Sequence, residues 1–162
     1  MSTRDSQRAR VYAAEEFVRT MFDRAAQHSS RAIDFFGIAL TLPPEARFAS
    51  VESVQRYVDD IVARVGATPV TVRARRGAAA AHYENDGVSA VIAVPAGSGT
   101  WALRELVVLH ELAHHLCAVT NADPPHGPAF VTAYCSLCES VMGPEVGLVL
   151  RMVYAKEGVV AG

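Results

Sequence analysis

The sequence has little net charge, no apolar leader and no long apolar run that is free of charges. Its formal net charge of -2 provides no general attraction for nucleic-acid phosphates or anionic membrane surfaces. Residues 1–10 are polar and lack the apolar stretch and cleavage site of a secretory signal. The most apolar segment, residues 103–119, contains glutamates, an arginine and histidines, and is therefore not a membrane span. We expect a cytoplasmic protein that binds neither nucleic acid nor a membrane.

Cysteines are few, and their number does not suit a disulfide framework. The chain has three, Cys117, Cys135 and Cys138, and reduced thiols are expected in a chain without an export signal. Cys135 and Cys138 have C-x-x-C spacing, but no second pair completes a four-cysteine zinc site. We predict that these two side chains pack in the core.

The length and composition fit one folded domain. Hydrophobic residues make up 51% of the 162 positions and charged residues 20%, a balance typical of folded domains rather than of disordered chains. We predict a single domain over residues 1–162, with short flexible ends at 1–6 and 158–162.

Hydrophobic periodicity and turn signals predict an α+β fold with a small, mostly antiparallel sheet packed against helices. Asn85-Asp86-Gly87 lies between two β-favouring runs and is a strong hairpin signal. Ser50 is a favourable helix N-cap, and Gly66 is a favourable helix stop. The predicted helices cover approximately residues 7–27, 50–65, 101–119, 128–143 and 144–157. The predicted strands cover residues 33–42, 69–75, 79–84 and 88–95.

The segment His110-Glu111-Leu112-Ala113-His114 has the H-E-x-x-H pattern. On a helix, the two histidines are separated by about 400° of rotation, so both imidazoles leave the same face one turn apart. That spacing lets two ring nitrogens bind one metal ion, while Glu111 is near enough to take a proton from a water on that ion. The flanking residues are apolar on almost every side, and a buried helix rarely carries such a cluster unless its polar groups are satisfied. We therefore predict a metal site rather than a solvent-exposed pair of histidines.

A catalytic zinc ion usually has three protein ligands and a water, so one further ligand is expected. The metzincin spacing is excluded, because its third histidine would fall at Thr120. Two candidates are His126, at the end of a loop just before a predicted helix, and Glu139 on that helix. His115 points about 100° away from His114, and we predict a structural role for it.

The stretch from Val108 to His114, followed by His126-Gly127-Pro128-Ala129-Phe130, resembles the H-E-L-x-H and H-G-x-x-F pattern of SprT-like and Spartan-type zinc proteases. That resemblance covers mainly residues 88–131. The length and the ending from Gly143-Pro144-Glu145 resemble a family of short actinobacterial metallohydrolases named for their H-E-x-x-H motif. The basic or zinc-ribbon extension of SprT-like proteins is not in this sequence, which argues against DNA-linked substrates.

The resemblance implies a zincin-like domain in which Phe130 packs the returning helix against the site. It also implies that residues 88–95 form an edge strand along which an extended peptide could pair. The zinc ligands and the catalytic acid/base that it implies are His110, His114, His126 and Glu111.

We predict a zinc-dependent metallohydrolase, with one zinc ion per chain, that cleaves an amide bond in a peptide or protein. Two alternatives are compatible with the same residues: hydrolysis of a small-molecule amide, and a non-catalytic metal-binding regulatory module. Glu111 favours catalysis, because a structural site needs no general base. The imidazole ligands also accept manganese, iron or cobalt. An oxyanion-stabilising group is required as well, and its candidates are Tyr83, Tyr134, Tyr154 and Arg151.

Overall fold

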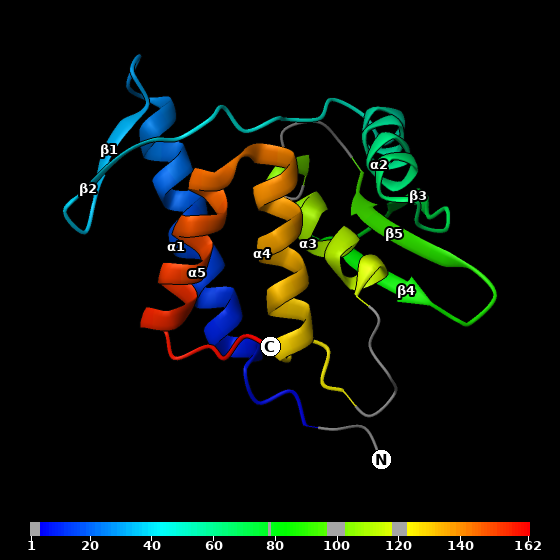
Figure 1. Ribbon diagram of the computed structural model, residues 1–162. Helices are drawn as coiled ribbons and strands as arrows, with labels where there is room; N and C mark the ends of the chain where they lie inside the picture. Colours follow the sequence, from blue (N-terminus) through cyan, green and yellow to red (C-terminus); the bar gives the residue numbers. More distant parts are fainter. Residues whose placement is uncertain (1–3, 78, 97–102, 118–122) are drawn as a thin grey trace. The chain divides into compact units, whose positions relative to one another are not determined.

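The computed structural model describes residues 4–77, 79–96, 103–117 and 123–162 (Figure 1). The chain divides into two compact units. A continuous unit comprises Ala46–Leu116, and a helical unit comprises Met1–Glu45 together with Cys117–Gly162. The described elements are five helices and two small sheets, which confirms the predicted α+β class. None of the described helices combines the length and the apolar character needed to cross a membrane.

The continuous unit contains a three-stranded sheet with the order β3-β5-β4. Strands β3 (Thr71–Arg75) and β5 (Ala90–Pro95) are parallel, whereas β4 (His82–Asn85) and β5 are antiparallel. Ile92 is therefore paired with a residue on each side, Val72 in β3 and Tyr83 in β4. Together with the antiparallel hairpin of the helical unit, two of the three strand pairings are antiparallel.

The expectation that residues 88–95 form an edge strand is wrong. Strand β5 is the central strand, and the two edges are β3 and β4. Its side chains from Ile92 to Val94 are completely buried, so both faces of the sheet are covered at this strand. Val88, the predicted start of this strand, lies before it and is 96% exposed.

The turn and cap signals of the continuous unit are confirmed. Helix α2 (Val51–Val65) begins with a capping box, in which the side chains of Ser50 and Ser53 each accept a hydrogen bond from the other's backbone N–H. It ends at Gly66 in the left-handed conformation, with φ of 68°. The Asp86 carboxylate accepts hydrogen bonds from the backbone N–H groups of Val88 and Ser89, which closes the β4–β5 turn.

Helix α3 (Glu105–Leu116) carries the H-E-x-x-H motif and is shorter than predicted. Trp101 and Val119, the predicted ends, lie outside the described residues. Among the described residues, the backbone at the start of the helix pairs with an earlier segment: Phe48 N donates to Leu103 O, and Glu105 N donates to Ala46 O. Because these backbone groups are used in strand-like pairing, the helix begins only at Glu105. Its carboxylate accepts hydrogen bonds from Ala46 N and the Tyr57 hydroxyl.

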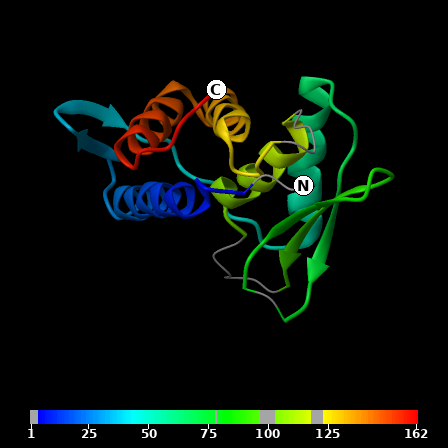
Figure 2. The same cartoon turned by 90° about the horizontal axis from the view of Figure 1, so that it is seen from below.

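The helical unit contains α1 (Arg8–Ala26), α4 (Pro128–Met142) and α5 (Pro144–Lys156), all close to their predicted bounds. Helix α5 packs against both α1 and α4, and Figure 2 shows these three helices together from below. Inside this unit, the buried Glu15 of α1 accepts a hydrogen bond from the hydroxyl of Tyr154. The buried stripe of α1 consists of the residues expected from its periodicity: Val11, Ala14, Val18, Phe22 and Ala25.

The predicted strand over residues 33–42 is a hairpin instead. It consists of β1 (Ala32–Phe35) and β2 (Ile38–Thr41), joined by Phe36 and Gly37. Both linking residues have positive φ, 48° and 82°, as a two-residue turn between antiparallel strands requires. The Asp34 carboxylate accepts a hydrogen bond from Gly37 N. The sequence analysis missed this turn because a bulky phenylalanine rarely takes a positive φ.

The C-terminal residues 158–162, predicted to be flexible, make several hydrogen bonds within the helical unit. Val160 N donates to the side-chain oxygen of Gln7, and the Gln7 amide donates to Val160 O. Gly162 N donates to Thr132 Oγ1, and the Thr132 hydroxyl donates to Gly162 O. The chain segment 158–162 is thereby tied to the starts of α1 and α4.

Candidate metal centre

Helix α3 supplies two histidines and one carboxylate. The rings of His110 and His114 lie one helical turn apart, with centroids 5.1 Å from each other and an angle of 72° between their planes. His110 is buried and His114 is half-buried. Glu111, between them in sequence, is only 8% exposed. A buried helix face with these three groups is the arrangement that the spacing predicts.

His126 lies immediately before α4 and is 5% exposed. The backbone turns tightly here, because Gly127 N donates to Pro124 O. A side chain at Gly127 would bring its Cβ to 2.7 Å from Pro124 Cγ, so the glycine of the His-Gly-Pro segment is required by this close approach. Pro128 then starts the helix, where its missing N–H has no intrahelical partner.

Contacts within the helical unit fix the position of the His126 ring. Its Nδ1 lies 2.7 Å from Oδ2 of Asp5, and its backbone oxygen accepts a hydrogen bond from the Gln7 amide. The rings of Tyr12 and Phe130 each have their centroid 5.1 Å from the centroid of the imidazole. Since a carboxylate only accepts hydrogen bonds, Nδ1 carries a proton, and in the neutral ring Nε2 then has a lone pair that can bind a metal.

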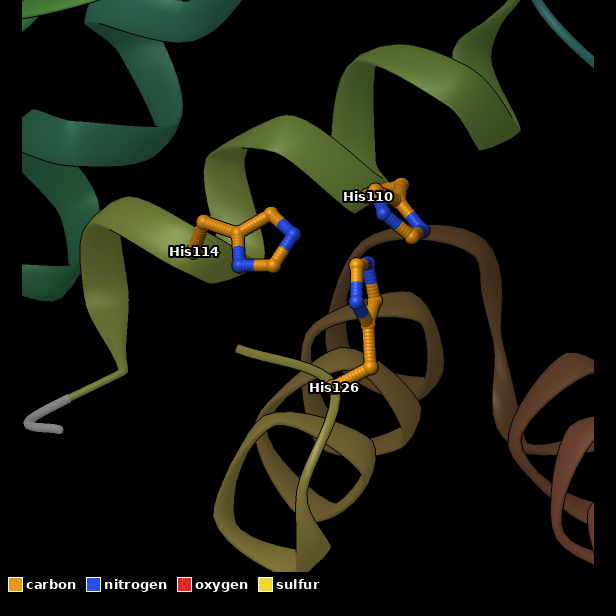
Figure 3. Close-up of side chains that lie close together, drawn as sticks. All are labelled: His110, His114 and His126. Atoms are coloured by element: carbon orange, nitrogen blue, oxygen red, sulfur yellow. The ribbon is translucent and has the colours of Figure 1, made fainter. Parts of the chain in front are cut away.

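Among the described residues, His110, His114 and His126 form a group that could hold a metal ion. Each offers one ring nitrogen, and these nitrogens all lie within 4.8 Å of one another. Figure 3 shows the three imidazole rings turned towards one another. The arrangement is compatible with one metal ion bound by all three histidines.

Glu139, the alternative third ligand, lies on α4 and forms an ion pair with Arg151 of α5, at 2.6 Å. The group of possible metal ligands contains His126 and does not include Glu139. The hydrogen bond to Glu139 is the main cause of a raised pKa of the Arg151 guanidinium. Glu139 and Arg151 are thus each other's partners in a half-exposed ion pair.

The four candidates for oxyanion stabilisation lie in different environments. Tyr134 and Tyr154 are 1% and 2% exposed within the helical unit, and burial raises the pKa of each phenol well above its usual value. Tyr83, on β4, is half-buried, and its ring lies parallel to that of His114, with centroids 6.2 Å apart. The ring of Tyr83 thus lies beside His114 of the H-E-x-x-H motif.

His115 and Tyr83 belong to a hydrogen-bond chain beside His114. His115 Nε2 lies 2.7 Å from the backbone oxygen of Thr68, so Nε2 carries the proton and donates it. In the neutral ring Nδ1 is then an acceptor, and the Tyr83 hydroxyl donates to it at 3.2 Å. The Tyr83 oxygen also accepts from the Asn85 amide, at 3.1 Å. Both nitrogens of His115 therefore have partners, in agreement with the predicted structural role.

The cysteines are free thiols, and the C-x-x-C pair lies in the core of the helical unit. Cys135 and Cys138 on α4 are 2% and 0% exposed, which confirms the predicted packing role. Burial raises the pKa of the Cys135 thiol to about 12. A thiol with that pKa stays protonated near neutral pH and is a poor metal ligand.

The sequence analysis missed the residues that hold His126, namely Asp5, Gln7 and Tyr12. Asp5 contacts a residue 121 positions away, and Gln7 contacts one 119 positions away. Asp5 also falls in the segment that we expected to be a flexible end. No local spacing signal connects these residues to His126, so a single sequence could not identify them.

The chain was compared with protein-family models, with curated proteins and with solved structures, and none of them matches it. The candidate metal centre is therefore defined by the residues of this chain alone.

Proposed function

We propose that this chain is a zinc-dependent metallohydrolase of zincin-like architecture that cleaves amide bonds in peptides or proteins. The observation that carries the proposal is the group formed by His110, His114 and His126, whose ring nitrogens lie within 4.8 Å of one another. Glu111 accompanies two of these ligands on the same helix. Three histidines, with no fourth ligand grouped with them among the described residues, are typical of catalytic rather than structural zinc sites.

The residues present fit a zinc ion. The Asp5 carboxylate fixes the proton of His126 on Nδ1 and leaves Nε2 for coordination. When bound, zinc supplies Lewis acidity, which lowers the pKa of water to about 7 and polarises a carbonyl group. The three imidazoles are neutral ligands, so the ion keeps its full charge for this chemistry. Imidazole also binds cobalt and manganese, and metal content decides which ion the purified protein holds.

Glu111 is the general base in this proposal. It follows His110 by one residue, about 100° around the helix, which lets it approach the ligand side without being a ligand. Its carboxylate takes a proton from the attacking water as the new C–O bond forms to the carbonyl carbon. The same carboxyl group then gives that proton to the leaving amine nitrogen as the C–N bond breaks. The carboxylate is thus returned to its starting state.

An extended peptide is the substrate class that the fold favours. Strand β4 is an edge of the three-stranded sheet, and its Tyr83 lies parallel to the ring of His114. An edge strand offers unpaired backbone groups to which an extended peptide can add as a further strand. This proposal replaces the expected pairing along residues 88–95, because those residues form the central strand β5.

The first experiment measures metal content by mass spectrometry in the wild type and in three variants, His126→Ala, Glu139→Ala and His28→Ala. We expect about one zinc per chain in the wild type, a clear loss in His126→Ala and no loss in the other two. His28 is an exposed histidine of the helical unit and serves as the matched control. Loss of zinc in Glu139→Ala with retention in His126→Ala would transfer the third-ligand role to Glu139. Absence of tightly held metal from the wild type would refute the proposal.

The second experiment compares Glu111→Gln with the wild type on a peptide library and on a panel of small amides. General acid–base catalysis typically contributes a factor of roughly 10²–10⁴, so the variant should keep its metal and lose activity by about that factor. Cleavage of small amides without peptide cleavage would make the chain a small-molecule amidohydrolase. A wild type that binds zinc and cleaves nothing would instead support a non-catalytic regulatory module.

A further inference from the structure

Asp5 is a half-buried carboxylate whose hydrogen bonding is incomplete. Its side chain is 19% exposed, and Oδ2 lies 2.7 Å from Nδ1 of His126. The second oxygen, Oδ1, is buried and has no hydrogen-bond partner among the described residues. Removing a carboxylate from water is costly unless nearby groups compensate its charge. A neutral imidazole that donates one hydrogen bond compensates only part of this cost.

We infer that Asp5 is a positioning residue that prepares His126 to bind a metal ion, an inference that rests on the proposed metal centre. A carboxylate cannot donate, so the contact is possible only when the proton of the neutral imidazole is on Nδ1. Nε2 then holds a lone pair. Without an acceptor at Nδ1, the proton could occupy Nε2, and that nitrogen could not bind a metal.

The contacts of His126 with Tyr12, Phe130 and Gln7 restrict its position but do not determine which ring nitrogen carries the proton. Tyr12 and Phe130 lie beside the imidazole with ring centroids at 5.1 Å, and they fix the plane of the ring. Gln7 holds the backbone by donating to His126 O. Aromatic packing and a backbone hydrogen bond are compatible with either tautomer. Of these contacts, the hydrogen bond to Asp5 selects the tautomer.

A metal ion would also account for the charge of Asp5. A cation on Nε2 withdraws electron density from the ring and strengthens the Nδ1–H donor, while the carboxylate makes the ring a more basic ligand. The negative charge of Asp5 and the positive charge of the ion are then joined through one imidazole. A half-buried carboxylate with one buried, unpaired oxygen is better compensated in that state than beside a neutral histidine alone.

The test uses the full chain and compares Asp5→Asn and Asp5→Ala with the wild type. Zinc affinity is measured by competition with a chromophoric chelator. Loss of a group that orients a metal-bound histidine typically weakens metal binding roughly 10- to 100-fold. We expect Asp5→Asn to lie near the lower end of that range, since its amide oxygen can still accept from Nδ1. Asp5→Ala should lie near the upper end.

Asp34→Asn is the matched control. Asp34 is an exposed aspartate of the same unit whose carboxylate accepts a local hydrogen bond from Gly37 N, in the β1–β2 turn. Its zinc affinity should equal that of the wild type. Urea unfolding of the metal-free proteins separates positioning from folding. If the loss of zinc affinity in Asp5→Asn were matched by an equal loss of metal-free stability, Asp5 would be a structural residue and the inference would be overturned.

A readout without metal completes the test. Histidine ring ¹⁵N spectra of the metal-free wild type should show the Nδ1–H tautomer at His126, and Asp5→Ala should reduce its population. An Nε2–H tautomer in the wild type would overturn the inference. If the wild type binds zinc and both Asp5 variants bind it with the same affinity, the inference about Asp5 would be overturned while the proposed function would stand. A wild type without zinc affinity would overturn both.

Discussion

The two chain segments that carry the histidines are held by different kinds of interaction. His110 and His114 belong to one helix, α3, whose residues from Glu105 to Ala113 are all buried. Their spacing is fixed by the helical backbone. His126 belongs to a short turn before α4 and depends on side chains that are more than a hundred residues earlier in the chain. The first two ligands are set by local periodicity, and the third is set by tertiary contacts.

This difference predicts two kinds of mutational response. A substitution that loosens the packing of α3 lowers the stability of the fold, but the helix keeps its two ligands in register as long as it remains folded. A substitution around His126 can leave the fold intact and still turn the imidazole away from the metal. Substitutions on α3 should therefore lower stability with little change in the zinc affinity of the folded protein, whereas substitutions around His126 should weaken zinc binding itself.

The largest expected effect is that of Phe130→Ala. Phe130 is completely buried and lies beside both His126 and Tyr134. Truncating a buried phenylalanine costs about 3–5 kcal/mol, and the change should also weaken zinc binding by the folded protein. Urea unfolding and chelator competition measure the two quantities. Phe17→Ala, at a position 48% exposed on α1, should change stability by no more than about 0.5 kcal/mol.

Leu112→Ala gives the matching measurement on α3. This completely buried side chain lies between the two histidines in sequence, and its truncation should cost about 2–5 kcal/mol. Because the helix still sets the ligand spacing, the zinc affinity of the folded variant should change less than that of Phe130→Ala. The reverse order of affinities would contradict the comparison.

Gln7→Ala should have an intermediate effect. The Gln7 amide donates to His126 O and Val160 O, and its oxygen accepts from Val160 N. Its removal leaves backbone groups without partners, at a cost of about 1–3 kcal/mol for a buried group. We expect lower stability in urea together with weaker zinc binding. An unchanged zinc affinity would mean that the backbone of His126 is fixed without Gln7.

Tyr83→Phe should have a smaller effect. The variant loses the hydroxyl that joins His115 to Asn85, at a cost of about 1 kcal/mol, and keeps the ring beside His114. Because α3 itself fixes His114, the zinc affinity of Tyr83→Phe should stay within a factor of about three of the wild-type value. It should therefore be well above the zinc affinity of Asp5→Ala. A loss as large as that of Asp5→Ala would show that α3 needs side-chain support as much as His126 does.

The cysteines provide the test with the smallest expected change. Cys135 has a pKa of about 12, so at pH 8 only about one thiol in 10⁴ is ionised, and the reaction with a disulfide reagent should be very slow. Raising the pH increases the thiolate fraction and should accelerate labelling. Cys117 is half-buried and should react first, although burial raises its pKa as well. Chelation of the metal should leave the labelling of Cys135 and Cys138 unchanged, and faster labelling would connect this pair with the metal.

Much of the fold could be predicted from the sequence where the signal is local. The approximate bounds of α1, α2, α4 and α5, the cap at Ser50, the left-handed Gly66 and the turn at Asp86-Gly87 follow from periodicity and from backbone preferences. The order of the strands could not be predicted, because pairing of β3 with β5 depends on contacts that no short pattern contains. The hairpin at Phe36-Gly37 was missed since its turn uses a phenylalanine in a conformation that usually favours asparagine or glycine.

In the candidate site, too, the residues linked by local spacing could be predicted from the sequence, and those brought together by distant contacts could not. The four-residue spacing of His110 and His114 predicts a shared helix face, and their rings indeed lie 5.1 Å apart. For the third ligand, the spacing left His126 and Glu139 open, and His126 was favoured partly by the resemblance. Asp5 could not be predicted, because its role depends on the approach of a segment 121 residues away.

The hydrogen bonds between Gln7 and Val160 also affect the order in which a growing chain can fold. Residues 46–116 form a continuous unit, whereas the helical unit joins segments from both sides of it. Contacts that span 153 residues require the closure of a far longer loop than those inside the continuous unit, and they form later. On the ribosome, α3 can therefore form with its first two histidines while the partners of Gln7 are still unsynthesised. A nascent chain passes through a stage with two oriented imidazoles, and its affinity for metal rises only when the late segments arrive.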